Sequence, residues 1–295
     1  MASYLFRLTG QAFNLTGQFS PRLAGRLAYR VFSSTGNRKP KSEKERAFLA
    51  ASASRMAEGT QTRLQIMGGQ SVTSHSFEPI GEANGRKVLV VHGWGSRIDF
   101  LEPLVTTLRR QGFAVVGLDL PGHGASTGRL LTVPMALDGI DKAWAEHGPF
   151  DFVVGHSFGG FATALSVSGA GGMVKPRTPK KLVIIAAPAD ARNVFRKYQS
   201  MLGFSDGVAR AMLSHAEQVI GVPAEHFHAP SHLKALEDLP VLVLHAEDDK
   251  EVDSQSAREY AAAGPQVTLS WMNGKGHRRI VSSPETMEAI TNFIV

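Results

Sequence analysis

The alternation of short apolar runs with segments of helical periodicity limits the fold of this chain more than any other feature. The run KVLVV at Lys87–Val91 is continuously apolar, as expected of a strand buried on both faces of a parallel sheet. Similar runs occupy Phe113–Leu120, Asp151–Gly155, Lys181–Ala187, Val241–Ala246 and Val267–Met272. Helical patterns occupy Phe100–Gln111, Met135–Glu146, Ser157–Val167, Ser254–Ala263 and Pro284–Ile294. The alternation predicts an α/β fold with a mostly parallel sheet and helices on both faces.

Two segments lie outside this alternation. RLQIM and SVTSHSFEPI flank a Gly-Gly pair and predict a hairpin ahead of the parallel strands. Residues 191–240 separate two strands and contain the helical pattern GVARAMLSHAEQVIG, and a structureless loop of that length would be unusual. We therefore expect a small helical cap at 191–240, inserted into a core of residues 62–190 and 241–295.

The composition excludes several kinds of site. The 295 residues include no cysteine, so disulfides, thiolate metal sites and cysteine nucleophiles are absent. A chain without cysteine fits a reducing compartment, and we expect a cytoplasmic protein. No apolar run approaches the ~18 residues that a membrane-spanning helix needs. His226, His228 and His232 in EHFHAPSH lack a common zinc spacing, so neither a metal nor a cofactor is expected.

The positive charge is concentrated at the N-terminus. Residues 1–41 carry seven basic side chains and no acidic one, so the net charge of +6 leaves −1 for the remaining 254 residues. The body of the chain is nearly neutral and lacks a cluster of basic and aromatic side chains, so a nucleic-acid partner is not expected. We assign residues 1–61 to a basic N-terminal helical arm.

The stretch SPRLAGRLAYRVF within this arm has the pattern of an amphipathic helix. Ser20 suits a helix N-cap and Pro21 the first helical position. The periodic side chains are the basic Arg22, Arg26 and Arg30, the apolar Leu23, Leu27 and Val31, and upstream Leu5, Leu8, Ala12 and Leu15. Three interpretations remain open: a helix that packs on the rest of the protein, peripheral membrane contact through residues 1–41, and an organelle transit peptide.

Three serines stand in a Gly-x-Ser-x-Gly pattern. Only Ser157 follows a predicted strand, DFVV, and precedes a predicted helix, FGGFATALSV. A sharp strand-to-helix turn exposes a serine hydroxyl and directs backbone N–H groups at a developing oxyanion, which is the arrangement of a nucleophile elbow. Ser126 follows PGHG without a helix and suits a structural loop, whereas Ser205 suits a helix N-cap. The alternative for Ser157 is a tight turn without chemistry.

The ends of the predicted strands carry five motifs: HGWG at His92–Gly95, DLPGHGAS at Asp119–Ser126, GHSFGG at Gly155–Gly160, HAEDD at His245–Asp249 and GKGH at Gly274–His277. With these motifs the chain from about Arg63 to Val295 resembles the serine α/β-hydrolase superfamily of esterases, lipases and related acyl hydrolases. The resemblance implies the α/β-hydrolase fold and a catalytic triad in the order serine, acid, histidine. It does not cover the N-terminal arm.

The resemblance also assigns the partners of Ser157. His277 is the expected base, in the loop before the last helix. The family's usual spacing makes Asp249 the acid, three residues after the end of its strand. Asp248 and Asp190 remain alternatives, because alanine replaces the family's common glycine at the end of that strand and some members take the acid from an earlier strand.

The expected oxyanion hole consists of the backbone N–H groups of Trp94 and Phe158. The resemblance implies a serine hydrolase that cleaves a carboxylic ester of a small-molecule acyl substrate, small or lipid-like. A peptidase or acyltransferase on the same triad, and a non-catalytic small-molecule-binding protein of this fold, remain alternatives because the fold alone does not determine the substrate. The acyl chain, the leaving group and the oligomeric state do not follow from the sequence.

Overall fold

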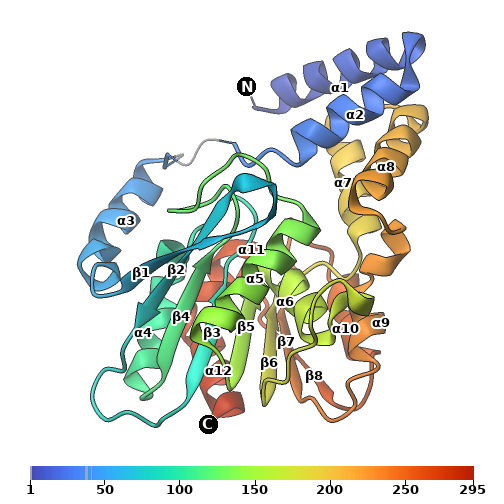
Figure 1. Ribbon diagram of the computed structural model, residues 1–295. Helices are drawn as coiled ribbons and strands as arrows, with labels where there is room; N and C mark the ends of the chain where they lie inside the picture. The colour runs from blue at the N-terminus through green and yellow to red at the C-terminus, as the bar shows by residue number, and fades with distance from the viewer. Residues whose placement is uncertain (1, 37–38, 41) are drawn as a thin grey trace. The chain divides into compact units, whose positions relative to one another are not determined.

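The chain forms two compact units in the structure, a computed structural model that describes residues 2–36, 39–40 and 42–295 (Figure 1). The first, which we call the helical unit, comprises Met1–Ser34 and Asp190–His228. The second, the sheet unit, comprises Thr35–Ala189 and Ala229–Val295. Arg38 and Lys41 of the predicted basic arm, and the side chain of Leu5, lie outside the described part of the chain.

The sheet unit is built on one sheet with the strand order β1-β2-β4-β3-β5-β6-β7-β8. The strands are β1 (Thr60–Gln65), β2 (Ser71–Phe77), β3 (Lys87–Val91), β4 (Ala114–Asp119), β5 (Phe152–His156), β6 (Lys181–Ile185), β7 (Val241–His245) and β8 (Val267–Trp271). β1 pairs antiparallel with β2, and β2 antiparallel with β4. The remaining neighbours pair in parallel. The structure thus contains the predicted hairpin and the predicted mostly parallel sheet.

Helices cover both faces of this sheet. The helices of the sheet unit are α3 (Glu43–Met56), α4 (Glu102–Arg110), α5 (Val133–His147), α6 (Phe158–Ser168), α9 (Ala229–Leu233), α10 (Gln255–Ala261), α11 (Gly276–Arg279) and α12 (Pro284–Ile294). Short 3-10 turns occupy η1 (Met67–Gly69), η2 (Ile98–Leu101), η3 (Ala170–Gly172) and η5 (Ile280–Ser282). Figure 1 shows α5 and α6 in front of the strands and α4 and α12 behind them.

The alternation of side chains along the strands explains the two covered faces. Val88 and Val90 of β3 join Leu104 and Leu108 of α4 and Ile290 of α12 in one buried cluster. The intervening residues of β3 are also buried, as expected for a strand with a helix layer on each side. The continuously apolar runs of the sequence are therefore strands with two buried faces.

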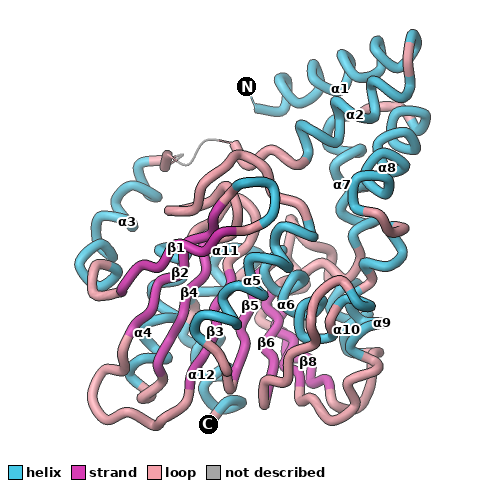
Figure 2. Tube along the Cα trace, viewed as in Figure 1, coloured by secondary structure: helices cyan, strands magenta, loops and turns pink. Residues whose placement is uncertain are grey.

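The helical unit contains no strand among its described residues (Figure 2). Its elements are α1 (Ala2–Phe19), α2 (Pro21–Phe32), α7 (Ala191–Leu202), α8 (Asp206–Ile220) and η4 (Ala224–Phe227). A buried cluster joins both parts of the chain: Phe13, Ala24, Ala28, Tyr29, Leu202, Phe204, Val208, Met212 and Ala216. At Gly25 a Cβ atom would lie 2.4 Å from the carbonyl carbon of Ala211, so α2 approaches the backbone of α8 closely only because this residue is glycine.

The division into units corrects the predicted boundaries. Residues 1–61 do not form one arm, since α1 and α2 share a core with α7 and α8, whereas α3 belongs to the sheet unit. Arg55 of α3 donates to the buried carboxylate of Glu102 at 2.5 Å. The cap predicted at 191–240 is likewise shorter, because α9 lies in the sheet unit, where the Ala229 N–H donates to the Ala189 carbonyl at 2.9 Å.

Candidate active site

Ser157 lies in a strained turn between β5 and α6. Its backbone has φ 53° and ψ −125°, a conformation that L-residues rarely adopt and that costs on the order of 1–3 kcal/mol. The turn is held from the sheet, since the Ser157 N–H donates to the carbonyl of Ile185 on β6 at 2.8 Å. Such strain persists only where surrounding contacts enforce it, and it is characteristic of a nucleophile elbow.

The glycines around Ser157 are required by close backbone contacts. A Cβ atom at Gly155 would lie 2.6 Å from the carbonyl oxygen of Gly159. A Cβ atom at Gly159 would lie 2.4 Å from the carbonyl oxygen of His92, at the end of β3. The Gly-x-Ser-x-Gly pattern at Ser157 is therefore a consequence of how tightly α6 starts against two strands.

The structure brings Ser157, His277 and Asp249 together in the sheet unit. The Ser157 Oγ atom lies 3.0 Å from Nε2 of His277, and Nδ1 of His277 lies 2.8 Å from Oδ2 of Asp249. The Asp249 side chain has no solvent-accessible surface, and that of His277 has 8%. With the carboxylate bonded to Nδ1–H, the imidazole presents Nε2 as an acceptor for the serine proton.

Asp249 is held as an anion by its surroundings. Its other oxygen, Oδ1, accepts hydrogen bonds from the backbone N–H groups of Glu251 at 2.7 Å and Val252 at 2.9 Å. Burial alone would raise the pKa of Asp249, but the bonds from His277 and from these amides lower it below its usual value. The carboxylate can therefore orient the imidazole and stabilise its charged form.

The two alternative acids occupy other positions. Asp248 is exposed, and its Oδ1 accepts from the Gly274 N–H at 2.8 Å. Asp190 belongs to the helical unit, where it caps α7 by accepting from the Arg192 N–H at 2.8 Å. Of the three carboxylates considered, Asp249 is the one whose oxygen is bonded to His277.

The two other pattern serines have structural contacts. Ser126 is buried, donates to the Asp119 carbonyl at 2.6 Å and accepts from the Thr73 N–H at 2.8 Å. Ser205 caps α8, where its Oγ accepts from the Val208 N–H at 3.4 Å. Both hydroxyls are thus committed to the backbone, as the sequence context predicted.

The residues of the predicted oxyanion hole lie beside the serine. A Cβ atom at Gly93 would be 2.7 Å from Cβ of Ser157, so the HGWG loop runs directly against the elbow. The rings of Trp94 and Phe158 meet edge to face with centroids 5.6 Å apart. Phe158 is the first residue of α6, where the helix supplies no acceptor for the backbone N–H.

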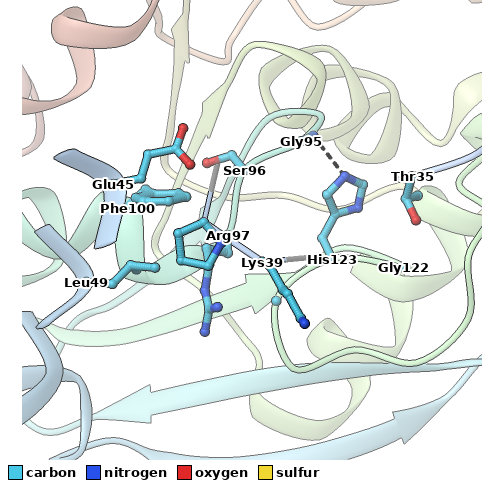
Figure 3. Close-up of a pocket in the computed structure, with 12 residues that line it drawn as sticks. Thr35, Lys39, Glu45, Leu49, Gly95, Ser96, Arg97, Phe100, Gly122 and His123 are labelled. Carbon is cyan, nitrogen blue, oxygen red and sulfur yellow. Dashed lines mark hydrogen bonds between the residues drawn. The ribbon is translucent and has the colours of Figure 1, made fainter. Parts of the chain in front are cut away.

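Two buried histidines, neither of which was expected to support the site, hold the HGWG loop. Nε2 of His123 accepts from the Gly95 N–H at 2.8 Å, and its Nδ1–H donates to the Pro121 carbonyl at 2.9 Å (Figure 3). Nε2 of His92 accepts from the Leu120 N–H at 3.0 Å, and its Nδ1–H donates to the Gly93 carbonyl at 2.7 Å. Burial lowers the pKa of His92, which keeps this ring neutral. The signal in the sequence that could have revealed this role is that each histidine precedes a glycine in a loop that follows a strand.

A third histidine, His156, supports the base through the backbone. It precedes Ser157, and its Nε2–H donates to the carbonyl of His277 at 3.0 Å. Burial, with a further effect from the charge of His277, lowers the pKa of His156 to about 3. The ring therefore stays neutral at physiological pH and adds no positive charge beside the base.

A shallow hollow of about 440 Å³, part of it open to solvent, lies next to the oxyanion loop (Figure 3). Gly95, Ser96, Gly122 and His123 line it, together with residues of α3 and the segment before it. None of Ser157, His277 and Asp249 lines this hollow. Among the described residues no group of three or more histidine or acidic side chains is arranged to hold a metal ion.

Known proteins resemble this chain in sequence and in fold. A model of the alpha/beta hydrolase family matches residues 88–290. A Pseudomonas putida protein described as the dihydrolipoyllysine-residue acetyltransferase component of an acetoin cleaving system is 32% identical over 152 residues, which are 48% of this chain and 36% of that protein. The chain therefore matches only about a third of that relative's length.

Solved structures show the same fold at low sequence identity. A membrane phospholipase A described as a bacterial virulence factor superposes with a TM-score of 0.59 at 18% identity, over 84% of this chain and 91% of that one. A putative lipase from Acinetobacter baumannii superposes with a TM-score of 0.61 at 16% identity, over 88% of this chain and 98% of that one.

Proposed function

Because the chain belongs to the alpha/beta hydrolase family, we propose that it is a serine hydrolase that cleaves a carboxylic ester through an acyl-enzyme intermediate. The observation that carries the proposal is the continuous hydrogen-bond chain from Ser157 Oγ through His277 to the buried Asp249. The base therefore lies within hydrogen-bonding distance of both the nucleophile and the orienting acid before any substrate binds.

The proposed reaction follows from these contacts. Nε2 of His277 takes the hydroxyl proton as Oγ of Ser157 attacks the acyl carbon, and Asp249 stabilises the imidazolium. The N–H groups of Trp94 and Phe158 stabilise the oxyanion. The tetrahedral intermediate collapses with cleavage of the ester C–O bond, and His277 gives its proton to the leaving alcohol. Water then attacks the acyl-enzyme, with its proton passing through His277, and the acid and free Ser157 are released.

We propose an ester rather than a peptide as the substrate. Two proteins that share the fold at 16–18% identity bear the names of a phospholipase and a putative lipase. Acyl transfer to an acceptor other than water is the second candidate, because the curated relative is described as an acetyltransferase component. Both candidates share the acyl-enzyme and differ only in what attacks it.

A fluorophosphonate probe tests the proposal, because it reacts covalently only with an activated serine. We expect the wild-type protein to be labelled and to hydrolyse p-nitrophenyl esters, and Ser157→Ala to lose both, with turnover lower by on the order of 10⁶. Ser126→Ala and Ser205→Ala are matched controls, since those serines stand in the same sequence pattern and bond to the backbone. A Ser157→Ala protein that kept hydrolysis, or a wild type that resisted the probe, would exclude this mechanism.

A panel of p-nitrophenyl esters of increasing acyl length then defines the substrate class. Added alcohol separates the two candidates, because a transferase would form the new ester and accelerate turnover, whereas a hydrolase would release mainly the free acid.

A further inference from the structure

The first two helices of the helical unit bury one face and leave another apolar face in solvent. On α1, Phe13 is buried, whereas Leu8, Ala12, Leu15 and Phe19 are exposed. These exposed positions follow helical spacing and lie on one face of α1. Phe19 is 85% exposed and Leu15 is 59% exposed. Leaving such large apolar side chains in water is unfavourable in free energy compared with burying them.

The second helix, α2, has three distinct faces. Ala24, Gly25, Ala28 and Tyr29 are buried against the rest of the helical unit. Leu23, Leu27 and Val31 form an exposed apolar row, each about 40–48% exposed, and Arg22, Arg26 and Arg30 form an exposed basic row beside it. Packing within the protein explains the first face and leaves the other two unexplained.

Charge selects the partner of the exposed face. In the described part of the chain α1 and α2 carry no acidic residue, and no carboxylate there forms an ion pair with Arg22, Arg26 or Arg30. A second copy docked through this face would bring two arginine rows together. A nucleic acid would bind the arginines and leave the apolar row in water. An anionic bilayer satisfies both rows, since its headgroups pair with the arginines and its acyl boundary takes up the apolar side chains.

We propose that α1 and α2 dock the protein onto the surface of an anionic lipid bilayer through Leu15, Phe19, Leu23, Leu27 and Val31, flanked by Arg22, Arg26 and Arg30. The helices lie in the interface, because no helix in the described residues is long and apolar enough to cross a membrane. The inference is independent of the proposed hydrolysis, since none of these side chains belongs to the Ser157 site.

The test is co-sedimentation of the full-length protein with vesicles. We expect binding to phosphatidylcholine vesicles that contain phosphatidylserine, weaker binding at high salt, and little binding to phosphatidylcholine alone. The triple variant Arg22→Gln, Arg26→Gln, Arg30→Gln should reduce the partition constant by on the order of 10². The double variant Phe19→Ser, Leu23→Ser should also reduce binding, and here the loss should persist at low salt because it removes apolar area.

A matched control has the same change in net charge elsewhere. The control variant carries Lys142→Gln, Lys175→Gln and Lys234→Gln, three exposed lysines of the sheet unit, and it should bind as the wild type does. Equal loss in the control, binding that ignores salt and lipid charge, or sedimentation-equilibrium dimers that the Phe19→Ser, Leu23→Ser variant dissociates would each overturn the proposal.

The same vesicles are tested with Ser157→Ala. Undiminished binding of this inactive protein is expected, so the docking and the chemistry are measured separately. Hydrolysis of a soluble ester by the arginine triple variant should equal that of the wild type, because these arginines lie outside the Ser157 site.

Discussion

Two aspartates of the sheet unit stand at or just after the ends of parallel strands, and each is bonded to a histidine. Asp119 ends β4, and its Oδ2 lies 3.0 Å from Nε2 of His75. Asp249 follows β7, and its Oδ2 lies 2.8 Å from Nδ1 of His277. A serine lies near each pair, Ser126 in one case and Ser157 in the other. The residue types are the same. The two groups differ in the hydrogen bonds that their side chains make with the rest of the protein.

Around Asp119 every contact stabilises the fold. Its carboxylate accepts from the Ile98 N–H at 2.9 Å and the Ala125 N–H at 2.8 Å, and a Cβ atom at Gly124 would lie 2.1 Å from Oδ2. Ser126 donates to one backbone group and accepts from another. The Asp119 centre therefore ties β2, β4 and the loop that follows β4 together.

Around Asp249 one imidazole nitrogen, Nε2 of His277, is available for proton transfer. Only one nitrogen of His277 is bonded to the carboxylate, and the other faces Ser157 Oγ at 3.0 Å. Ser157 is partly exposed on a strained turn, whereas Ser126 is fully buried. A serine, a histidine and an aspartate therefore form a candidate site where the hydroxyl is accessible and one imidazole nitrogen faces it.

The largest expected effect is that substitution of Asp249 lowers turnover, whereas substitution of Asp119 lowers stability. Asp249→Asn should lower turnover by on the order of 10⁴, because an asparagine favours the wrong imidazole tautomer, with little loss of stability. Asp119→Asn should instead lower the free energy of unfolding by about 1–3 kcal/mol, because the buried amide group lacks one of the two carboxylate oxygens that accept from N–H groups, and the folded fraction should keep its turnover. Ester kinetics and urea unfolding of both variants measure this.

Asp248→Asn is the control for the first of these variants. Its side-chain oxygen still accepts from the Gly274 N–H, so turnover should stay close to that of the wild type. A ranking in which Asp248→Asn lost more activity than Asp249→Asn would transfer the orienting role to the neighbouring carboxylate.

A smaller effect is expected at His123, where the Asp119 loop reaches the Ser157 site. His123→Phe removes the acceptor that holds the Gly95 N–H, so the loop that carries Trp94 should shift and kcat should fall by about 10². His123→Gln keeps an acceptor oxygen and should restore part of the loss. Steady-state kinetics should show the change in kcat rather than in KM. If the phenylalanine variant had wild-type kcat, the loop would not depend on this contact.

The smallest expected effect is the pH dependence of stability at Asp119. Burial alone would raise the pKa of Asp119, but the bond from His75 and the nearby His92 and amide groups lower it from 3.8 to about 2. A depressed folded pKa contributes stability that is complete above the unfolded value of 3.8 and is lost as the pH falls toward 2. This contribution is about 2 kcal/mol.

Urea unfolding from pH 5 downward measures it. The difference in free energy of unfolding between the wild type and Asp119→Asn should be constant near pH 5 and should shrink as the pH falls below about 4. A difference that did not change with pH would mean that Asp119 titrates normally, and the contrast with the Ser157 site would then rest on packing alone.

Much of the sheet unit could be predicted because its signals are local. The strand β3 was predicted with its exact bounds from its continuously apolar run, and α12 from its helical pattern. The position of Ser157 followed from a strand on one side and a helix on the other. The order of serine, acid and histidine followed from the family resemblance.

Long-range contacts made the rest unpredictable. The amphipathic pattern of α2 was compatible with a packed helix, with membrane contact and with a transit peptide. No local signal showed that α8, far along the chain, covers one of its faces. His156 and the carbonyl of His277 are 121 positions apart, and His123 and Gly95 are 28 apart, so no local pattern links them.

The layered α/β architecture and the tight turn at Ser157 followed from the sequence, because each depends on residue types within a short window, whereas His277 was assigned through the family resemblance. Only the folded structure shows that Asp249, and not the adjacent Asp248, is bonded to His277. The Asp249 carboxylate also accepts from two backbone amides, whereas Asp248, one position earlier in the loop, is exposed. The folded structure also shows that α1 and α2 share a core with α7 and α8, which lie more than 150 positions later in the chain. Such a core depends on contacts between distant segments, which no local pattern reveals.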